Sequence, residues 1–384
     1  MSRSRRDFVR TLGLCGFSTS FIIGRGREAM AFGAAAVDRP DDGGMIRISS
    51  NENARGPGKK AIDAIREAMT ARMGRGYPPD YTNDLIETIA RHYKVPKESV
   101  ITATGSGPIL EAAVHAFCSP SKPLVTAGPT YGTSEATARR MGVPVKSVHV
   151  DRALALDLEG MAAAAAGAGL VYICNPNNPT GTAHNAAAIE RVVRRIRRES
   201  PETAIHIDEA YMDYTYDPAV KTASALTQEL PKVFISKSFS KAHGMAGLRI
   251  GYAVGQKETV TPIAQAWGIG SMNTLSAAAA VASMEDPAHL EAEVKENARV
   301  RDFTLQAFRK MGYDVKEPHT NHMFLDLGRP ASQFREACRA LGVEVGRDFP
   351  PMENTHSRIS LGTMDEMRKA VEVFRTVLMA RSTL

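Results

Sequence analysis

A stretch of sixteen residues near the middle of the chain gathers side chains suited to bind an anion or to react. Residues 236–251 read Ser-Lys-Ser-Phe-Ser-Lys-Ala-His-Gly-Met-Ala-Gly-Leu-Arg-Ile-Gly and follow an apolar run at 233–236 that is typical of a buried strand. Hydroxyls and glycines beside a cation favour an anion site, because N–H and O–H donors can close around phosphate oxygens. A lysine there could be a phosphate counter-charge, or an amine that forms a Schiff base with a carbonyl cofactor.

Polar residues also follow other predicted strands at their carboxyl ends, where open α/β sheets bind ligands. Asp208 ends one such strand and Tyr211 lies just beyond it. An acid in that place suits a protonated ring nitrogen as its partner. His206, in phase with Asp208, is interpreted as a core histidine. Asn178 belongs to the loop Asn-Pro-Asn-Asn-Pro-Thr-Gly at 175–181, which its prolines and glycine keep non-helical.

A glycine-rich turn, Gly-Ser-Gly at 105–107, leads from a predicted strand into a predicted helix. Such a turn aims free N–H groups and the positive end of the helix dipole at an anion. It lacks the Gly-Lys-Ser/Thr of a nucleotide-binding loop, and by itself it is equally consistent with tight packing alone.

The elements that must position these residues alternate between strand and helix from residue 100 onward. This alternation indicates an α/β fold with a mostly parallel sheet sandwiched by helices. A smaller α+β region is predicted to follow, in which residue 315 and residues 323–327 pair with 343–345 and 358–361, around a helix at 332–341 and before a last helix at about 365–380.

Composition narrows the classes of function. The 384 residues are enough for a large and a smaller domain, and no apolar run is long enough for a stable membrane span. The formal charge of +6 is concentrated in residues 1–31, which carry +4 and leave +2 for the rest, so no nucleic-acid partner is expected. There is no zinc-ligand spacing, and the four cysteines are interpreted as free thiols.

The first 31 residues predict a twin-arginine export leader. Arg5 and Arg6 precede a modest apolar segment, and Ala29-Met-Ala31 offers a cleavage site. We therefore expect a periplasmic or otherwise exported protein that uses the twin-arginine machinery. The alternative is a basic N-terminal helix on a cytoplasmic protein.

In their order along the chain, these motifs resemble those of class I/II aminotransferases of fold type I that depend on pyridoxal 5'-phosphate (PLP). Ser238-Phe-Ser-Lys241, Ala246-Gly-Leu-Arg249 and the loop at 175–181 carry the resemblance, which is greatest to the histidinol-phosphate aminotransferase-like branch and covers about residues 45–380. One departure is that Ala54 and Arg55 stand where the branch has proline after Asn-Glu-Asn. Another is that an export leader does not suit an intracellular substrate such as histidinol phosphate.

The resemblance implies a role for each matched residue and a homodimer with shared active sites. Lys241 would be the Schiff-base lysine and the general base and acid, and Asp208 would be the partner of the ring nitrogen. The ring oxygen would be contacted by Asn178 and Tyr211, the ring would be stacked on by Tyr131, and the phosphate would be held by Ser106, Gly107, Ser238 and Arg249. Tyr77 (or Tyr81) would make a contact across the dimer interface, and the substrate would be bound by Asn53 and by Arg358, which would clamp a carboxylate.

The resemblance also implies a domain plan and a reaction. The plan is a signal peptide at 1–31, an N-terminal arm and helix associated with the small domain at 32–75, a large PLP-binding domain at 76–275 and a small C-terminal domain at 276–384. The reaction moves an amino group between an amino acid, or an amino-acid-like phosphate such as histidinol phosphate, and a 2-oxo acid, without a metal. The alternatives are a PLP-dependent decarboxylase of an amino-acid phosphate and a PLP-binding protein without catalysis.

Overall fold

A computed structural model of the chain describes residues 44–70, 80–266 and 269–379. The predicted leader and Tyr77 lie outside these residues. Tyr81, the alternative to Tyr77, lies in α2 (Asp80–Tyr93).

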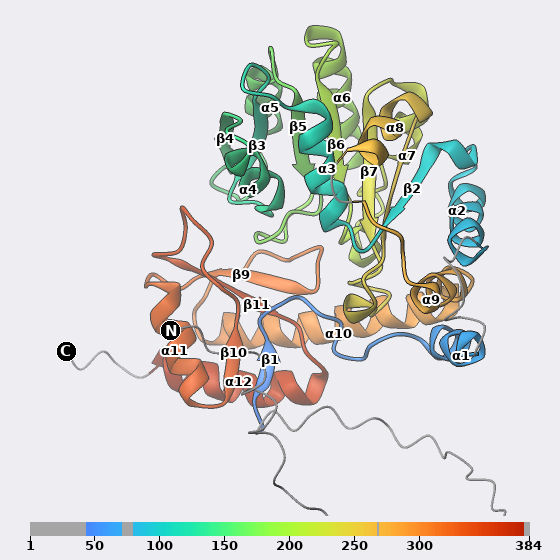
Figure 1. Ribbon diagram of the computed structural model, residues 1–384. Helices are drawn as coiled ribbons and strands as arrows, with labels where there is room; N and C mark the ends of the chain where they lie inside the picture. The colour runs from blue at the N-terminus through green and yellow to red at the C-terminus, as the bar shows by residue number, and fades with distance from the viewer. Residues whose placement is uncertain (1–43, 71–79, 267–268, 380–384) are drawn as a thin grey trace, which may run out of the picture. The chain divides into compact units, whose positions relative to one another are not determined.

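The larger part of the fold is built on a seven-stranded sheet with the strand order β2-β8-β7-β6-β5-β3-β4 (Figure 1). β8 is antiparallel to both neighbours and the other pairs of neighbouring strands are parallel, which confirms the predicted α/β class. The strands are β2 (Val100–Ala103), β3 (Leu124–Gly128), β4 (Val145–His149), β5 (Leu170–Cys174), β6 (Ala204–Asp208), β7 (Val233–Ser238) and β8 (Gly251–Gly255). The edge strand β4 was not predicted, because only two of its five residues are apolar.

Helices cover both faces of this sheet, so successive residues of one strand enter two different cores. Val171 and Ile173 of β5 pack in one hydrophobic cluster, whereas Leu170 and Tyr172 pack in the other. A strand buried on both faces reads as a continuous apolar run, which is why these strands were predictable. The flanking helices are α3 (Gly107–Phe117), α4 (Thr133–Arg140), α5 (Leu158–Ala164), α6 (Ala186–Glu199), α7 (Ser224–Glu229) and α8 (Lys257–Gln265).

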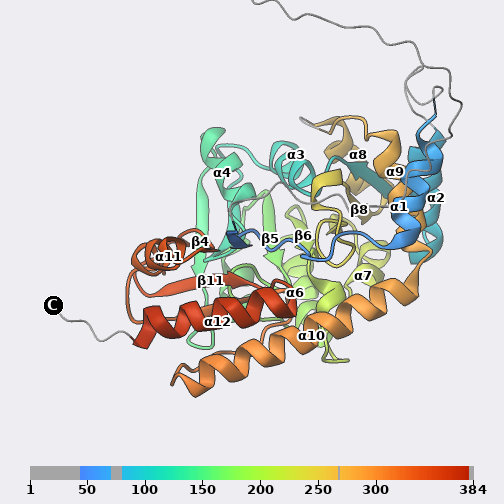
Figure 2. The same cartoon turned by 90° about the horizontal axis from the view of Figure 1, so that it is seen from below.

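Three helices pack together beside the sheet (Figures 1 and 2): α1 (Lys59–Ala68), α2 and α9 (Thr274–Met284). Alanines of α1 and α9 join Leu85 and Ile89 of α2 in the core of the larger part. α1 ends at Ala68, before the predicted residue 73, and the C-cap residue that follows, Met69, is 60% exposed. The predicted domain boundaries stay a prediction.

The smaller part contains two separate two-stranded sheets. β1 (Ile46–Ile48) pairs in parallel with β10 (Val343–Val345), and β9 (His322–Asp326) pairs antiparallel with β11 (His356–Ser360). The predicted pairing of 323–327 with 358–361 is confirmed by β9 and β11. The predicted partner of 343–345 was wrong, because β10 pairs with the N-terminal segment, and Val315 is a buried core residue outside any strand. Apolar patterns identify a strand, but its partner depends on contacts across about 300 residues of chain.

Three helices complete the smaller part: α10 (Pro287–Lys310), α11 (Ala331–Ala340) and α12 (Met364–Met379). α10 and α12 lie side by side in the view from below (Figure 2). Among the described helices, none is long and apolar enough to cross a membrane. Cys118, Cys174 and Cys338 are buried free thiols, as predicted.

Candidate active site

A cavity of about 810 Å³ lies where the carboxyl ends of β5, β6 and β7 meet the N-terminal segment and the smaller sheets. The structure brings most of the predicted site residues to its wall: Ser106, Gly107, Tyr131, Asn178, Asp208, Tyr211, Ser238, Lys241, Arg249 and Arg358. Asn53 is not among the residues that line it.

Lys241 lies on a tight turn directly after β7. The buried ring of Phe239 anchors this turn, whose backbone closes with bonds from Gly244 N to Lys241 O and from Met245 N to Phe239 O, both 2.9 Å. The Lys241 amine donates to the carbonyl of Asn51 at 3.1 Å. Burial, followed by the cation of Arg358, lowers the pKa of Lys241 to about 8. A larger share of this amine is therefore neutral near pH 7 than of an ordinary lysine.

Lys237, the other lysine of the motif, has a different environment. Its amine forms an ion pair with Asp213 at 2.6 Å, and both side chains are largely buried. Burial alone would lower the pKa of Lys237, but the carboxylate of Asp213 outweighs it and the pKa is raised. Lys237 is thus held as a cation, and it is not part of the cavity wall.

Asp208 is buried beneath the cavity and held by neutral donors on one face of the sheet. Tyr172 donates to Oδ2 at 2.8 Å, and the Ser236 hydroxyl donates to Oδ1 at 3.3 Å. His206 lies 2.8 Å from the Ser236 hydroxyl through Nε2, and burial lowers its pKa to about 3, so it is a neutral core histidine. Burial raises the pKa of Asp208, and the hydrogen bond from Tyr172 partly offsets this. Such a carboxylate is suited to a cationic partner.

An anion cradle is formed where the start of α3 meets the turn that carries Arg249. The side chain of Ser106, the residue before α3, makes no capping bond in the described part of the chain, so its hydroxyl is free for a ligand. Gly105 has φ +93°, and a Cβ there would lie 2.3 Å from Nη2 of Arg249. A Cβ at Gly251 would meet the Ser106 nitrogen at the same distance, 2.3 Å. Only glycine allows this close approach.

The loop at 175–181 connects two of the predicted cofactor contacts. Asn177 donates to the carbonyl of Pro129 at 3.1 Å and accepts from Thr130 at 2.6 Å, which ties its neighbour Asn178 to the loop of Tyr131. Asn178 is 3% exposed, whereas Tyr131 is 36% exposed and lines the cavity.

Arg358, on β11, is a buried cation at the cavity wall. It donates to Oδ1 of Asn178 at 3.0 Å and to the carbonyl of Ser49, and its guanidinium lies 4.8 Å from the ring centroid of Phe349. Its Nε has no hydrogen-bond partner within the described residues. Burial lowers its pKa to about 10, so the group is still charged at neutral pH. A planar buried cation with a free donor is suited to a carboxylate.

The sequence analysis chose Asn53 from the N-terminal segment, but Asn51 is the asparagine that reaches the cavity. Asn53 instead donates to the carbonyl of Ala242 at 3.3 Å and accepts from Arg55 N at 3.0 Å. The sequence offered only a weak signal for Asn51, namely that asparagine tolerates the left-handed backbone conformation. In the structure Asn51 adopts that conformation, with φ +54°.

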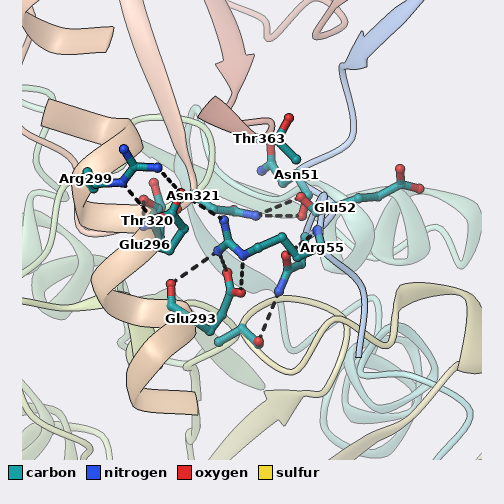
Figure 3. A network of polar contacts seen from close by, with 12 residues as sticks. Asn51, Glu52, Arg55, Glu293, Glu296, Arg299, Thr320, Asn321 and Thr363 are labelled. Atoms are coloured by element: carbon teal, nitrogen blue, oxygen red, sulfur yellow. Dashed lines mark hydrogen bonds and ion pairs between the residues drawn. The ribbon is translucent and has the colours of Figure 1, made fainter. Parts of the chain in front are cut away.

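Arg55, one of the departures from the branch pattern, fixes this segment to α10 (Figure 3). Its guanidinium forms a forked ion pair with the buried carboxylate of Glu293, with Nε to Oε2 at 2.8 Å, and its Nη1 lies 3.9 Å from Glu296. The Glu293 side chain is 3% exposed and that of Arg55 is 31% exposed, so losing Arg55 would leave a buried carboxylate without its cation, and the ion pair anchors the segment.

The fold and this cavity define an α/β enzyme in which a lysine of lowered pKa and a buried carboxylate line the same cavity. Residues 44–374 match the family model "Aminotransferase class I and II", and the chain belongs to this family. It is 31% identical to a histidinol-phosphate aminotransferase of Symbiobacterium thermophilum, over 87% of this chain and 91% of the relative. It is 32% identical to an aromatic amino acid aminotransferase of Thermobifida fusca, again over 87% and 91%.

A solved structure has the same fold. The histidinol-phosphate aminotransferase of Sinorhizobium meliloti in complex with pyridoxal-5'-phosphate superposes with a TM-score of 0.79 and 27% identity, covering 87% of this chain and 91% of that one. The family is PLP-dependent, and the protein is a PLP-dependent aminotransferase, as predicted. No cluster of candidate metal ligands occurs within the described ranges.

Proposed function

We propose that Lys241 is the amine that binds PLP and moves the proton in a transamination between an amino acid and a 2-oxo acid. The observation that carries this assignment is the contrast between the two lysines of the motif. Lys241 reaches the cavity with a pKa lowered to about 8, while Lys237 is held by Asp213 away from the cavity.

The walls of the cavity fit PLP group by group. The cradle of Ser106, Gly107, Ser238 and Arg249 is suited to its phosphate, and Tyr131, which is 36% exposed on the cavity wall, is suited to stack on its aromatic ring. Asp208, buried among neutral donors, suits a protonated ring nitrogen.

Asn178 and Tyr211 fit the ring oxygen. Asn178 keeps its amide N–H groups for this contact, because its Oδ1 already accepts from Arg358. When bound, PLP acts as an electron sink that makes the substrate's α-hydrogen acidic.

The remaining chemistry belongs to the chain. Arg358 binds and orients the substrate carboxylate through its planar guanidinium, which brings the Cα–H toward Lys241. The neutral fraction of the Lys241 Nζ accepts the Cα proton as a general base and returns it as a general acid. With a pKa of about 8, Lys241 has both its neutral and its protonated form populated near neutral pH.

The relatives suggest two classes of amino donor. One is an amino-acid-like phosphate such as histidinol phosphate, and the other is an aromatic amino acid, as named for two of the relatives. Purified protein loaded with PLP should be incubated with each donor, first alone for the half-reaction and then with 2-oxoglutarate for turnover. Transamination leaves a carbonyl product from the donor and pyridoxamine phosphate in the half-reaction, whereas release of CO₂ would identify a decarboxylase. A protein that does neither would contradict the proposal.

Assembly and export are proposed on the sequence alone. Tyr77 matches the family tyrosine that crosses a dimer interface, so the working unit is proposed to be a homodimer. Residues 1–31 are proposed to direct export through the twin-arginine machinery, which carries folded, cofactor-loaded proteins.

A further inference from the structure

Asn51 uses all of its polar atoms inside the protein. It is 1% exposed, its φ of +54° lies in the left-handed region, and it has contacts in both parts of the fold. Its side-chain Nδ2 donates to the Tyr211 hydroxyl at 2.9 Å and faces Nδ1 of His322 at 3.0 Å. A strained non-glycine residue that is held by this many bonds is typical of a functional site.

The hydrogen bonds fix the direction in which the Asn51 amide points. The hydroxyl of Ser360 accepts from Asn51 N at 2.8 Å, and its own proton is donated to Asn51 Oδ1 at 2.7 Å. The NH₂ group therefore faces Tyr211 and His322. Ser360 and His322 are directly paired residues of β11 and β9, so one residue pair of this small sheet contacts both the Oδ1 and the Nδ2 atom of Asn51.

The contact with Tyr211 has a definite polarity. Because Asn51 is the donor, the Tyr211 oxygen is the acceptor, and the phenol's own proton is left to point elsewhere. Tyr211 is 3% exposed and lines the cavity, and its ring packs edge-on against His322 at 5.1 Å between centroids. The phenol proton is not used in the bond with Asn51, and Tyr211 lines the cavity, where a bound ligand would be able to accept it.

We infer that Asn51 is a positioning residue whose amide turns the Tyr211 hydroxyl toward the cofactor. This inference rests on the proposed function, because it assigns Tyr211 to the cofactor. It concerns a residue of the N-terminal segment that the sequence analysis left without a role.

The backbone of Asn51 has a separate task that must be preserved in a test. Its carbonyl accepts from Lys241 Nζ at 3.1 Å. It also accepts from Asn321 Nδ2 at 3.1 Å, and Asn321 donates in addition to the carbonyl of Glu52 at 3.3 Å (Figure 3). The variant Asn51→Gly keeps this carbonyl and the left-handed backbone while it deletes the amide. The variant Asn51→Asp keeps the shape but replaces the donor by an acceptor, which draws the Tyr211 proton away from the cavity.

The experiment is a double-variant cycle that measures the dissociation constant of PLP. We would dialyse holoenzyme against a series of PLP concentrations. The proteins compared are the wild type, the single variants Asn51→Asp, Asn51→Gly and Tyr211→Phe, and the two double variants that combine an Asn51 change with Tyr211→Phe. Bound cofactor is then read from its absorbance. Tyr93→Phe is the matched control, because that tyrosine bonds to Tyr252, 3.0 Å away, and not to Asn51.

We expect Asn51→Asp to weaken PLP binding about tenfold, and Asn51→Gly about fivefold, the effect of losing one oriented hydrogen bond. In a protein that already carries Tyr211→Phe, either Asn51 change should raise the dissociation constant of PLP by less than about a further twofold. In a protein that carries Tyr93→Phe, the increases caused by the two changes should multiply. Losses that multiply in the Tyr211 background, or single variants that bind PLP like the wild type, would overturn the inference. The wild-type half-reaction is scored separately, so its failure would count against the proposed function instead.

Discussion

Replacing Tyr172 by phenylalanine removes the shortest hydrogen bond to Asp208, that from the phenol to Oδ2 at 2.8 Å. The ring is fully buried and stays in place, so the change deletes one oxygen and little else. A hydrogen bond to a charged group contributes about 1.5–3 kcal/mol, whereas one to a neutral group contributes about 1 kcal/mol. The difference of about 0.5–2 kcal/mol between the two protonation states, at about 1.4 kcal/mol per pKa unit, should raise the pKa of Asp208 by about half a unit to one and a half units.

The sign of the effect on stability follows from linkage. Burial already raises the pKa of Asp208 above the unfolded value of 3.8, so the folded protein keeps this proton to a higher pH than the unfolded chain does. The variant raises the folded pKa further. The loss in the free energy of unfolding should therefore be small in acid, where Asp208 is protonated in both proteins. It should grow as the pH rises through the folded pKa values and level off above them at about 1.5–3 kcal/mol.

The assay is urea unfolding of the cofactor-free protein at a series of pH values, starting just above 3.8. Tyr93→Phe is again the control, since it deletes a phenol that bonds to the neutral hydroxyl of Tyr252. Its loss should not change across the acid range. A Tyr172→Phe loss that is equally independent of pH would refute the view that the phenol stabilises an ionised Asp208.

Three further outcomes are expected. Lys241→Ala should abolish both the visible absorbance of bound PLP and turnover, while Lys237→Ala keeps the absorbance; the reverse pattern would show that the lysine was wrongly assigned. If Tyr77 completes the site of a neighbouring subunit, light scattering should find at least a dimer at assay concentration, and a fully active monomer would argue against this. Changing both Arg5 and Arg6 to Lys should retain the protein in the cytoplasm, loaded with PLP. N-terminal sequencing of the native protein should begin near residue 32, and an uncut chain in the cytoplasmic fraction would contradict the proposed leader.

Most strands of the large sheet, and most of its functional edge, could be predicted from the sequence. Strands such as β5 and β6 are apolar throughout because both of their faces are buried, so they are recognisable without any partner. Asp208 ends β6 and Lys241 follows β7, and parallel strands bring such carboxyl ends to one edge whatever the rest of the chain does.

The residue of the N-terminal segment that reaches the cavity could be identified only from the folded chain. A tripeptide such as Asn51-Glu-Asn53 has no periodicity that tells which side chain reaches the cavity, and the structure selects Asn51 because the β9–β11 pair binds its amide. The pairing of β1 with β10 and the ion pair of Arg55 with Glu293 likewise join residues more than two hundred positions apart. Such contacts depend on where the whole chain folds back, whereas a local pattern records only whether a residue is buried or exposed.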